Sequence, residues 1–447
     1  LICLALSPLA PAQAEPVKEK TFFDVTTTSD NGDGNPGDCL CQTIGAPSTC
    51  SLRAAFEEAN ACSGNDEIRL NNGVTYTVAT PLRVDAASID PLEKIFLHSD
   101  DDNGTKPIIQ GTGEKDYSAL SVVMGTLDVT NLTISDSEGF YVVRAMGGAT
   151  MDGRLNLDKI LMIDNWEASA YEDDRRYGGG AIRNSMGSVT INNSVFNNNR
   201  SINNCGGAIN NSGHLVIQNS TFLDNIAPYG GAICHVGLRW PEPPYETWNV
   251  EIYNSEFASN VGSYLGGAIF LSGPSLYDDY NIIQDSYFHD NISYYGSGGA
   301  IFAGYTNIDP SGGGFVLRRS TISNNTADTG GGLSLANPGN FQDREVVYIE
   351  NSTISGNQAE IHGGGIYMGN VSYQAQDADP SVYIHNSTIS NNTADYLGTE
   401  SGNGGGIYNN ALTKAALLKN SILAGNIDGS TGMLAFIMPD CKGSINL

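Results

Sequence analysis

The residues of this chain that could carry out acid–base chemistry include three pairs of adjacent carboxylates, Asp101-Asp102, Asp173-Asp174 and Asp278-Asp279. Glycoside hydrolysis needs two carboxyl groups facing each other across a groove, and a lyase reaction needs a base, usually beside bound calcium. Adjacent strand residues point to opposite faces, so each pair predicts one surface charge and one turn residue. His214 and His235 lie by strand ends without an obvious partner. We therefore assign no catalytic residue. The alternative function is a carbohydrate-active enzyme, a polysaccharide lyase or hydrolase, of which we favour the lyase.

A possible cation site lies near the N-terminus, where Asn31, Asp33 and Asn35 alternate with glycines. Oxygen ligands at every second position are typical of a calcium loop. Such a loop has glycine at its sixth position and a bidentate glutamate at its end, but Pro36 and Gln42 stand at these places here. The sequence leaves two interpretations open, a calcium site and a simple Asx turn stabilised by its own side chains.

The cysteines predict an oxidising compartment. Four of them cluster in a short segment: Cys39, Cys41, Cys50 and Cys62. We expect a disulfide framework there, although four cysteines permit three pairings, and the spacing fits no common zinc finger. Cys205 and Cys234 occupy non-equivalent repeat positions, so we expect two buried thiols rather than a bridge. Cys441 has no evident partner.

Aromatic side chains gather in five insertions, at residues 236–249, 273–280, 304–314, 336–345 and 369–381. We take these residues as candidates for binding: Trp240, Tyr245, Trp248, Tyr277, Tyr280, Tyr305 and Tyr373. Exposed aromatic rings beside acidic groups suit stacking on sugar rings or protein recognition. The alternative is that the rings fold down over the backbone of their own loops.

A sequence repeat predicts the strands that position these insertions. Eight times between Gly179 and Asn426 the chain has Gly-Gly-Ala-Ile or a close variant, a β-branched run, and then Asn-Ser-x-Phe-x-x-Asn or its equivalent. A period of roughly 26–35 residues is typical of a stacked array. Short β-branched stretches with many Gly and Asn residues exclude helices and predict three strands per coil of an all-β, right-handed parallel β-helix.

Two columns of this β-helix can be read from the sequence. We expect one apolar interior stack, made of Phe196, Phe222, Phe257, Phe288, Ile322, Ile354, Ile389 and Leu423. We expect an amide ladder in which asparagine also takes the left-handed turn conformation, made of Asn199, Asn225, Asn260, Asn291, Asn325, Asn357, Asn392 and Asn426. The insertions occupy the same corner of successive coils and should project from one face. Acidic residues recur two or three positions after the ladder asparagine, at Asp328, Glu360 and Asp395. Like charges in one line repel each other, so these side chains either bind cations or spread apart into water.

The composition limits the partners. The chain has 22 Lys and Arg against 49 Asp and Glu, a formal charge of −27. Such acidity argues against nucleic acid and anionic membranes and favours divalent cations or cationic ligands. No segment after the first residues approaches the length of a membrane span. We expect a host or surface protein, or a polysaccharide, as partner.

The sequence predicts four regions. Residues 1–14 end in Ala12-Gln13-Ala14 and predict a truncated signal peptide, and hence export. Residues 15–85 form a cap with one helix over Ser51–Ala61, because an array must cover its first open edge. Residues 86–178 are degenerate coils, and residues 179–447 are regular coils that we expect to be incomplete at the C-terminus.

Three resemblances follow from these motifs. The paired Gly-Gly-Ala-Ile and Phe-x-x-Asn motifs over residues 179–426 resemble the repeats of polymorphic outer-membrane proteins, whose β-helical passengers are adhesins. Residues 50–56, Cys-Ser-Leu-Arg-Ala-Ala-Phe, resemble the CSLREA-type region that precedes such helices, with Ala54 in place of its Glu. Residues 439–443 resemble the closing coil of β-helix proteins with variable surface anchors. These resemblances imply an extracellular or outer-membrane address and an adhesin, while polysaccharide lyases and pectin hydrolases share the fold.

Overall fold

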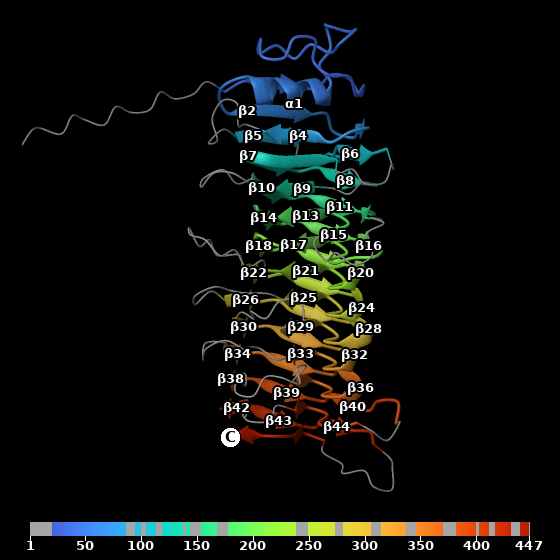
Figure 1. Ribbon diagram of the computed structural model, residues 1–447, viewed down its shortest axis with the longest axis vertical. Helices are drawn as coiled ribbons and strands as arrows, with labels where there is room; N and C mark the ends of the chain where they lie inside the picture. Colours follow the sequence, from blue (N-terminus) through green and yellow to red (C-terminus); the bar gives the residue numbers. More distant parts are fainter. Residues whose placement is uncertain are drawn as a thin grey trace, which may run out of the picture.

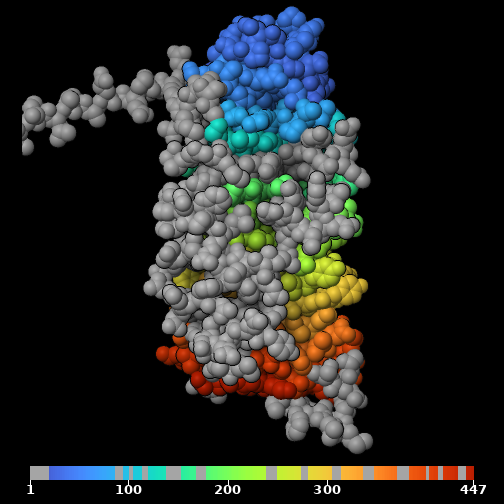
Figure 2. All heavy atoms as spheres, in the orientation of Figure 1, coloured from blue at the N-terminus to red at the C-terminus, as the bar shows by residue number. Residues whose placement is uncertain are grey.

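The fold is a long stack of β-coils, seen in a computed structural model of the chain (Figure 1). The structure describes residues 20–85, 94–99, 104–112, 119–136, 140–143, 153–167, 178–237, 249–272, 280–304, 314–336, 346–369, 381–398, 402–410, 416–430 and 439–446. All strand pairings between the named strands of this part are parallel, and equivalent strands of successive coils pair in register. The expectation of an all-β parallel β-helix is confirmed. Figure 2 shows the N-terminal cap in blue at one end and the last coils in red at the other.

The strands form three sheets. The largest has twenty-five strands and covers two faces, which β7 joins. Its first face consists of β4 (Leu82–Asp85), β7 (Leu120–Thr130), β9 (Phe140–Val143), β13 (Ile182–Ser185), β17 (Ile209–Asn211), β21 (Ile233–Val236), β25 (Ile269–Ser272), β29 (Ile301–Gly304), β33 (Leu333–Ala336), β37 (Ile366–Gly369), β41 (Ile407–Asn409) and β45 (Cys441–Lys442). Its second face adds β1 (Phe22–Asp24), β2 (Asp66–Leu70), β5 (Lys94–Ser99), β10 (Gly153–Asp158), β14 (Ser188–Asn192), β18 (His214–Gln218), β22 (Val250–Tyr253), β26 (Tyr280–Gln284), β30 (Gly314–Arg318), β34 (Val346–Glu350), β38 (Ser381–His385), β42 (Ala416–Lys419) and β46 (Ile445–Asn446).

The other two sheets have twelve and nine strands. The twelve-stranded sheet consists of β3 (Thr75–Val78), β6 (Ile108–Gly111), β8 (Thr133–Ser135), β11 (Leu161–Ile163), β15 (Val195–Asn197), β19 (Thr221–Leu223), β23 (Glu256–Ala258), β27 (Tyr287–His289), β31 (Thr321–Ser323), β35 (Thr353–Ser355), β39 (Thr388–Ser390) and β43 (Ile422–Ala424). The nine-stranded sheet consists of β12 (Trp166–Glu167), β16 (Arg200–Ser201), β20 (Ile226–Tyr229), β24 (Val261–Leu265), β28 (Ile292–Ser297), β32 (Thr326–Thr329), β36 (Gln358–His362), β40 (Thr393–Ala394) and β44 (Ile427–Asp428).

A regular coil therefore has four strands, and the expectation of three was wrong. The missed strand follows the ladder asparagine, as β20 follows Asn225. It carries mixed residues such as Ile-Ala-Pro-Tyr, without the β-branched alternation that marks the other strands. Register with its neighbours, rather than its own strand propensity, makes this segment extended.

Tight corners separate the four strands. The first glycine of each Gly-Gly pair has a positive φ, and a Cβ added to Gly206 would lie 2.0 Å from the carbonyl oxygen of Ile209. A Cβ on Gly207 would lie 2.2 Å from the carbonyl oxygen of Gly231 in the next coil. These glycines therefore mark a corner too tight for side chains.

The predicted apolar column fills the interior. Phe196, Phe222, Phe257 and Phe288 stack with ring centroids 4.6–4.7 Å apart and interplanar angles of 3–7°. Their register continues through Ile322, Ile354 and Ile389, all fully buried, to a partly buried Leu423. One continuous core therefore runs through the stack.

The amide ladder is present, and it is longer than expected. Each Nδ2 donates to the Oδ1 of the next asparagine at 2.9–3.0 Å, from Asn199 to Asn426. Asn165 extends the ladder at one end, and Asp440 accepts from Asn426 at 3.0 Å at the other. The left-handed conformation belongs to the preceding residue, such as Asp290 (φ 56°) before Asn291, which corrects the expectation for the ladder itself.

The N-terminal cap covers the first coil. Its helix α1 spans Leu52–Ala61, close to the predicted range, and Ser51 caps it by accepting from the Ala54 N–H. Ala54, which stands where the CSLREA-type motif has Glu, is fully buried. The buried Glu58 accepts from the N–H groups of Gly37 and Cys39, both at 2.9 Å, which ties the loop before α1 to the helix.

Candidate functional site

Most of the predicted binding residues lie outside the described part of the chain: Trp240, Tyr245, Trp248, Tyr277, Tyr305 and Tyr373. The same holds for the acid pairs Asp101-Asp102, Asp173-Asp174 and Asp278-Asp279. Tyr280 is described. It is partly buried in β26, and its ring is tilted against that of Tyr348 at 6.2 Å.

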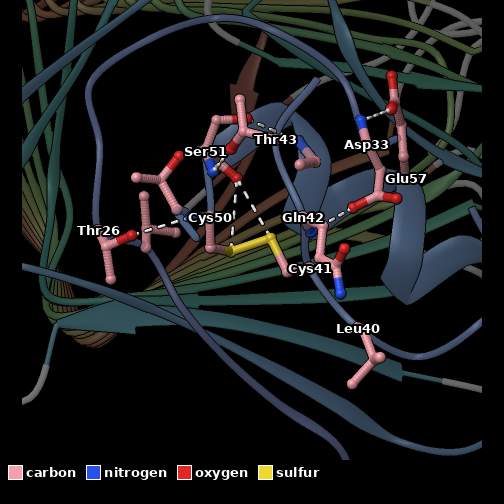
Figure 3. Close-up of a disulfide and its surroundings, with 12 residues drawn as sticks. Thr26, Asp33, Leu40, Cys41, Gln42, Thr43, Cys50, Ser51 and Glu57 are labelled. Atoms are coloured by element: carbon pink, nitrogen blue, oxygen red, sulfur yellow. Dashed lines mark hydrogen bonds between the residues drawn. A yellow bond between two sulfur atoms is a disulfide. The ribbon is translucent and has the colours of Figure 1, made fainter. Parts of the chain in front are cut away.

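The four N-terminal cysteines form two disulfides, Cys39–Cys62 and Cys41–Cys50. Figure 3 shows the second one beside Ser51, whose carbonyl oxygen faces both sulfur atoms. The expectation of a disulfide framework in this segment is confirmed, and the structure selects one of the three pairings. Cys441 is a free, partly buried thiol.

Cys205 and Cys234 also form a disulfide, with their Cα atoms 5.3 Å apart, so the expectation of two free thiols was wrong. Their repeat positions differ, but the glycine corner between Cys205 and β17 folds the chain back beside that strand. Cys234 pairs in register with Asn210 of β17 and thus comes next to Cys205. The bond links two successive coils.

Asp33, the central residue of the candidate calcium loop, is almost fully buried. Its carboxylate accepts from the N–H of Asn35 at 2.7 Å and from the N–H of Gln42 at 2.6 Å (Figure 3 shows the second bond). The bond from Asn35 is that of an Asx turn, the alternative interpretation of this segment, and the bond from Gln42 ties the turn to a later part of the loop. Among the residues that the structure describes, no group of three or more His, Cys, Asp or Glu is arranged to hold a metal ion.

The two histidines singled out in the sequence have partners. His214 Nδ1 lies 2.8 Å from Asn249 Oδ1, and His235 Nδ1 lies 2.8 Å from Asn211 Nδ2. Both side chains therefore make polar contacts between coils. The partners are 35 and 24 residues away in the sequence, so the sequence alone does not show them.

The outer face of the twelve-stranded sheet changes character along the stack. Three successive strands, β31, β35 and β39, have the sequence Thr-Ile-Ser, with the isoleucine buried. Two strands before them, β23 and β27, keep the buried Phe257 and Phe288. Their other residues are Glu256, Ala258, Tyr287 and His289. Titratable and aromatic side chains thus replace hydroxyls at positions that do not contribute to the core.

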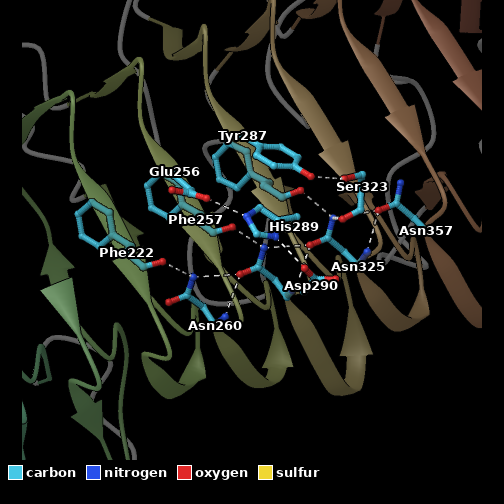
Figure 4. Close-up of polar contacts among 12 residues, drawn as sticks. Phe222, Glu256, Phe257, Asn260, Tyr287, His289, Asp290, Ser323, Asn325 and Asn357 are labelled. Carbon is cyan, nitrogen blue, oxygen red and sulfur yellow. Dashed lines mark hydrogen bonds and ion pairs between the residues drawn. The ribbon is translucent and has the colours of Figure 1, made fainter. Parts of the chain in front are cut away.

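These residues and the corner residue Asp290 form what we call the His289 cluster: Glu256, Tyr287, His289 and Asp290 (Figure 4). His289 Nε2 lies 3.0 Å from Glu256 Oε1, and its Nδ1 lies 2.7 Å from Asp290 Oδ2. The Tyr287 ring stacks on the imidazole at 4.3 Å, and its hydroxyl accepts from Ser323 Oγ at 3.1 Å.

The surroundings of His289 favour its charged form. Partial burial by itself lowers the pKa of the imidazole, but the hydrogen bonds and charges of Asp290 and Glu256 outweigh it, so the pKa of His289 is raised above its ordinary value. Both carboxylates remain about half exposed, at 55% for Asp290 and 46% for Glu256. They can therefore also contact a ligand.

A second feature lies around the next corner, on the nine-stranded sheet. The register of β24, β28, β32 and β36 is interrupted by bulges at the same place in successive coils. The residues at these irregular places include Tyr264, Tyr294 and Tyr295, then Asp328, which lies opposite the bulges of its two neighbours, and Glu360. We call these five residues the bulge stripe. A bulge changes the direction of its side chains and leaves its extra residues out of the strand pairing. The side chains of the stripe are therefore not needed for the hydrogen bonding of the sheet.

The tyrosines of the stripe are exposed: 49% for Tyr264, 57% for Tyr294 and 76% for Tyr295. The two bulges are nested, because a Cβ on Gly296 would lie 1.7 Å from the carbonyl oxygen of Tyr264. The Ser293 hydroxyl donates to the same carbonyl at 3.0 Å. The local backbone therefore holds the rings outward with specific contacts.

The acidic end of the stripe is crowded. Burial raises the pKa of Asp328, and the neighbouring carboxylate of Glu360 raises it further. The pKa of Tyr396 is also raised, first by burial and then by Glu360 and Asp328. Asp395, the third acid of the predicted line, is buried and has a positive φ, so it does not continue an exposed column.

The sequence analysis singled out Asp328 and Glu360 but missed the tyrosines of the stripe and the His289 cluster, although a signal for each was present. Asn225 precedes its Gly-Gly pair at Gly230 by five residues, whereas Asn260 precedes Gly266 by six and Asn291 precedes Gly298 by seven. These extra residues are the lengthened bulges. For the His289 cluster, the signal was the presence of Glu256 and His289 at strand positions that hold Thr or Ser in β31, β35 and β39.

The comparisons with known proteins give three findings. Residues 386–410 match the Chlamydia polymorphic membrane protein repeat, which suggests a surface or outer-membrane protein. A comparison with curated protein sequences gave no match. Among solved structures, a rhamnogalacturonan lyase is similar with 12% identity and a TM-score of 0.24, over 90% of this chain and 75% of the other. Within the described residues, no helix is long and apolar enough to cross a membrane.

Proposed function

We propose that this chain is exported, displayed on a cell surface, and works as an adhesin-like binding protein through the bulge stripe and the His289 cluster. The observation that carries the proposal is the bulge stripe. The two successive coils that contain β24 and β28 are lengthened at one corner and expose tyrosines there, and the acids Asp328 and Glu360 occupy the same place in the next two coils. An exposed tyrosine adds little to the stability of a β-helix, whereas tyrosines are enriched in binding interfaces.

The position of the two features supports one continuous site. Glu256 and Tyr264 come from one coil, and His289, Asp290, Tyr294 and Tyr295 come from the next. Only the corner at Asn260 and Asn291 separates the two groups, and these asparagines are held by the amide ladder at 3.0 Å. A rigid corner with different side chains on its two sides is a suitable support for a binding surface.

The lyase alternative gains no support from the His289 cluster. A general base needs a lone pair that is free to accept a proton from the substrate. Both ring nitrogens of His289 lie within 3.0 Å of a carboxylate oxygen, and its pKa is raised, so the imidazole is already protonated over a wider pH range. The cluster suits binding better than proton abstraction.

A binding assay with matched variants tests the proposal. Beads coated with the full chain would be incubated with cultured host cells and with a panel of immobilised polysaccharides and proteins. We expect the double variant Tyr294→Ala, Tyr295→Ala to reduce binding about tenfold or more, because interface tyrosines can each contribute more than about 1 kcal/mol. The matched control is Tyr348→Ala, Tyr383→Ala, which removes two stacked tyrosines from another sheet.

Equal binding by the stripe variant and the unchanged chain would contradict the proposal, provided that both fold. The same panel with and without calcium also tests the lyase alternative. New reducing or unsaturated ends after incubation with a polysaccharide would show an enzyme instead of a simple binding protein.

A further inference from the structure

We infer that the bulge stripe binds an extended, arginine- or lysine-rich protein segment that lies along the axis of the β-helix. This inference rests on the proposed function, since it names the ligand chemistry of the same surface. It goes further by choosing a cationic protein segment over the polysaccharides that a surface β-helix could also bind.

The geometry of the stripe suits an extended chain. Its residues come from four successive parallel strands, β24, β28, β32 and β36, at the places where their register shifts. Coils stack about 4.8 Å apart, so the stripe is roughly 14 Å long. An extended peptide rises about 3.3 Å per residue and directs every second side chain to the same face. A segment of about five residues therefore covers the stripe with two or three side chains.

The aromatic end suits cations better than a flat sugar surface. The rings of Tyr294 and Tyr295 are 6.3 Å apart and inclined at 42°, and those of Tyr229 and Tyr264 are 5.5 Å apart and inclined at 39°. Inclined rings do not form one flat platform for stacked sugar rings. They do offer separate ring faces, and a guanidinium or ammonium group binds over such a face within about 6 Å.

The charges of the surface complement a cationic ligand. Burial raises the pKa of Asp328, and the negative charge of the nearby Glu360 raises it further, so the ionised Asp328 lies in a repulsive field. A bound cation relieves this repulsion, whereas an anionic glycan increases it. Glu256 and Asp290, around the corner, add two partly exposed carboxylates. The formal charge of −27 attracts basic partners over a longer range.

Synthetic peptides test the inference with the full chain. The probe is a peptide of about twelve residues in which arginine alternates with glycine, long enough to cover the stripe with a margin. Matched peptides replace each arginine by glutamate or by serine. Affinities would be measured at physiological salt, because low salt strengthens non-specific attraction between exposed charges.

Four proteins would be compared. One stripe variant is Tyr294→Ala, Tyr295→Ala, and the other is Asp328→Asn, Glu360→Gln. The charge control is Asp24→Asn, Asp136→Asn. It also removes two negative charges, but at exposed positions outside the stripe. Circular dichroism and the unfolding midpoint would establish that each variant is folded.

The expected result is that the arginine peptide binds the unchanged chain and that each stripe variant loses about tenfold in affinity, while the charge control loses less than about twofold. Equal losses in the charge control and the stripe variants would overturn the inference, because binding would then depend on net charge alone. Binding of a neutral polysaccharide, with no preference for the arginine peptide over the serine peptide, would overturn the inference and leave the proposed function intact. If the stripe variants bind every cell, polysaccharide and peptide probe as the unchanged chain does, both the inference and the proposed function fail.

Discussion

Two regions of the twelve-stranded sheet share one interior and differ on the outside. Strands β31, β35 and β39 repeat Thr-Ile-Ser, while β23 and β27 combine a buried phenylalanine with Glu256, Tyr287 and His289. Both regions keep the apolar column and the amide ladder without interruption. The repeated residues thus build the coil, and the outward residues that break the pattern are free to serve binding.

The same contrast is found on the nine-stranded sheet. Ala227, Ala327, Ala359 and Ala394 are buried and pair in register or occupy equivalent places in their strands. The residues that follow the first three alanines, Pro228, Asp328 and Glu360, differ between coils and are more exposed, whereas Asp395 after Ala394 is buried. If this division is correct, variants of the framework lose stability, and variants of the bulge stripe lose binding. Variants of both kinds test this division.

The largest effect is expected for Phe257→Ala. Its ring is fully buried and stacks on Phe222 and Phe288 at 4.7 Å, so the substitution leaves a cavity in the continuous core. We expect a loss of about 4 kcal/mol in the free energy of unfolding, measured by urea denaturation. Thr321→Ala, in the regular region and only partly buried, is the control and should change stability by less than about 0.5 kcal/mol. Similar losses in the two variants would contradict the division.

Asn291→Ala should have the next largest effect. The Asn291 side chain accepts from the N–H and the Nδ2 of Asn260 and donates to Asn325 and to the Phe257 carbonyl oxygen. Its removal leaves buried polar groups without partners, at a cost of about 3 kcal/mol in the free energy of unfolding. Urea denaturation would measure this loss against Asn197→Ala, a substitution at a partly exposed strand residue. An unchanged midpoint for Asn291→Ala would show that the ladder is dispensable.

The sequence predicts the framework well because the framework is repeated. The spacing of Phe257, Phe288 and their equivalents gives the interior column, and the recurring asparagine gives the ladder. The sequence predicts the left-handed corner residue less well. The residue directly before each ladder asparagine has the left-handed conformation, and its type varies, as in Ser259, Asp290 and Asn324. A conformation that several residue types can adopt leaves a weak pattern in a single sequence.

The candidate site could be predicted only in part, because it depends on contacts between coils. Glu256 and His289 are 33 residues apart and meet only through the register of β23 with β27. Cys205 and Cys234 meet through a glycine corner that shifts their apparent repeat positions. Sequence alone gives the period of the array, while side-chain contacts require the exact register of each coil.

A smaller effect is expected from the titration of His289. The folded pKa of this group is raised, so its contribution to stability is complete below the unfolded pKa of about 6.5 and is lost as the pH rises through the folded pKa. The unfolding midpoint of the unchanged chain should therefore fall relative to that of His289→Gln as the pH increases from about 6 to 8. Urea denaturation of both proteins at several pH values would measure the difference. A constant difference across this range would contradict a charge-stabilised His289.

The smallest effect on stability is expected for the double variant Tyr294→Ala, Tyr295→Ala. Both rings are more than half exposed, and the bulge that carries them is held by Gly296 and by the Ser293 hydroxyl. The free energy of unfolding should change by less than about 0.5 kcal/mol for each substitution, as for most surface substitutions. The same variant should lose most of its binding in the bead assay. Phe257→Ala should instead lose stability, and this contrast is what a division between framework residues and binding residues predicts. A large loss of stability in urea denaturation would instead assign the two tyrosines to the framework, because the bulge would then need their packing to keep its shape.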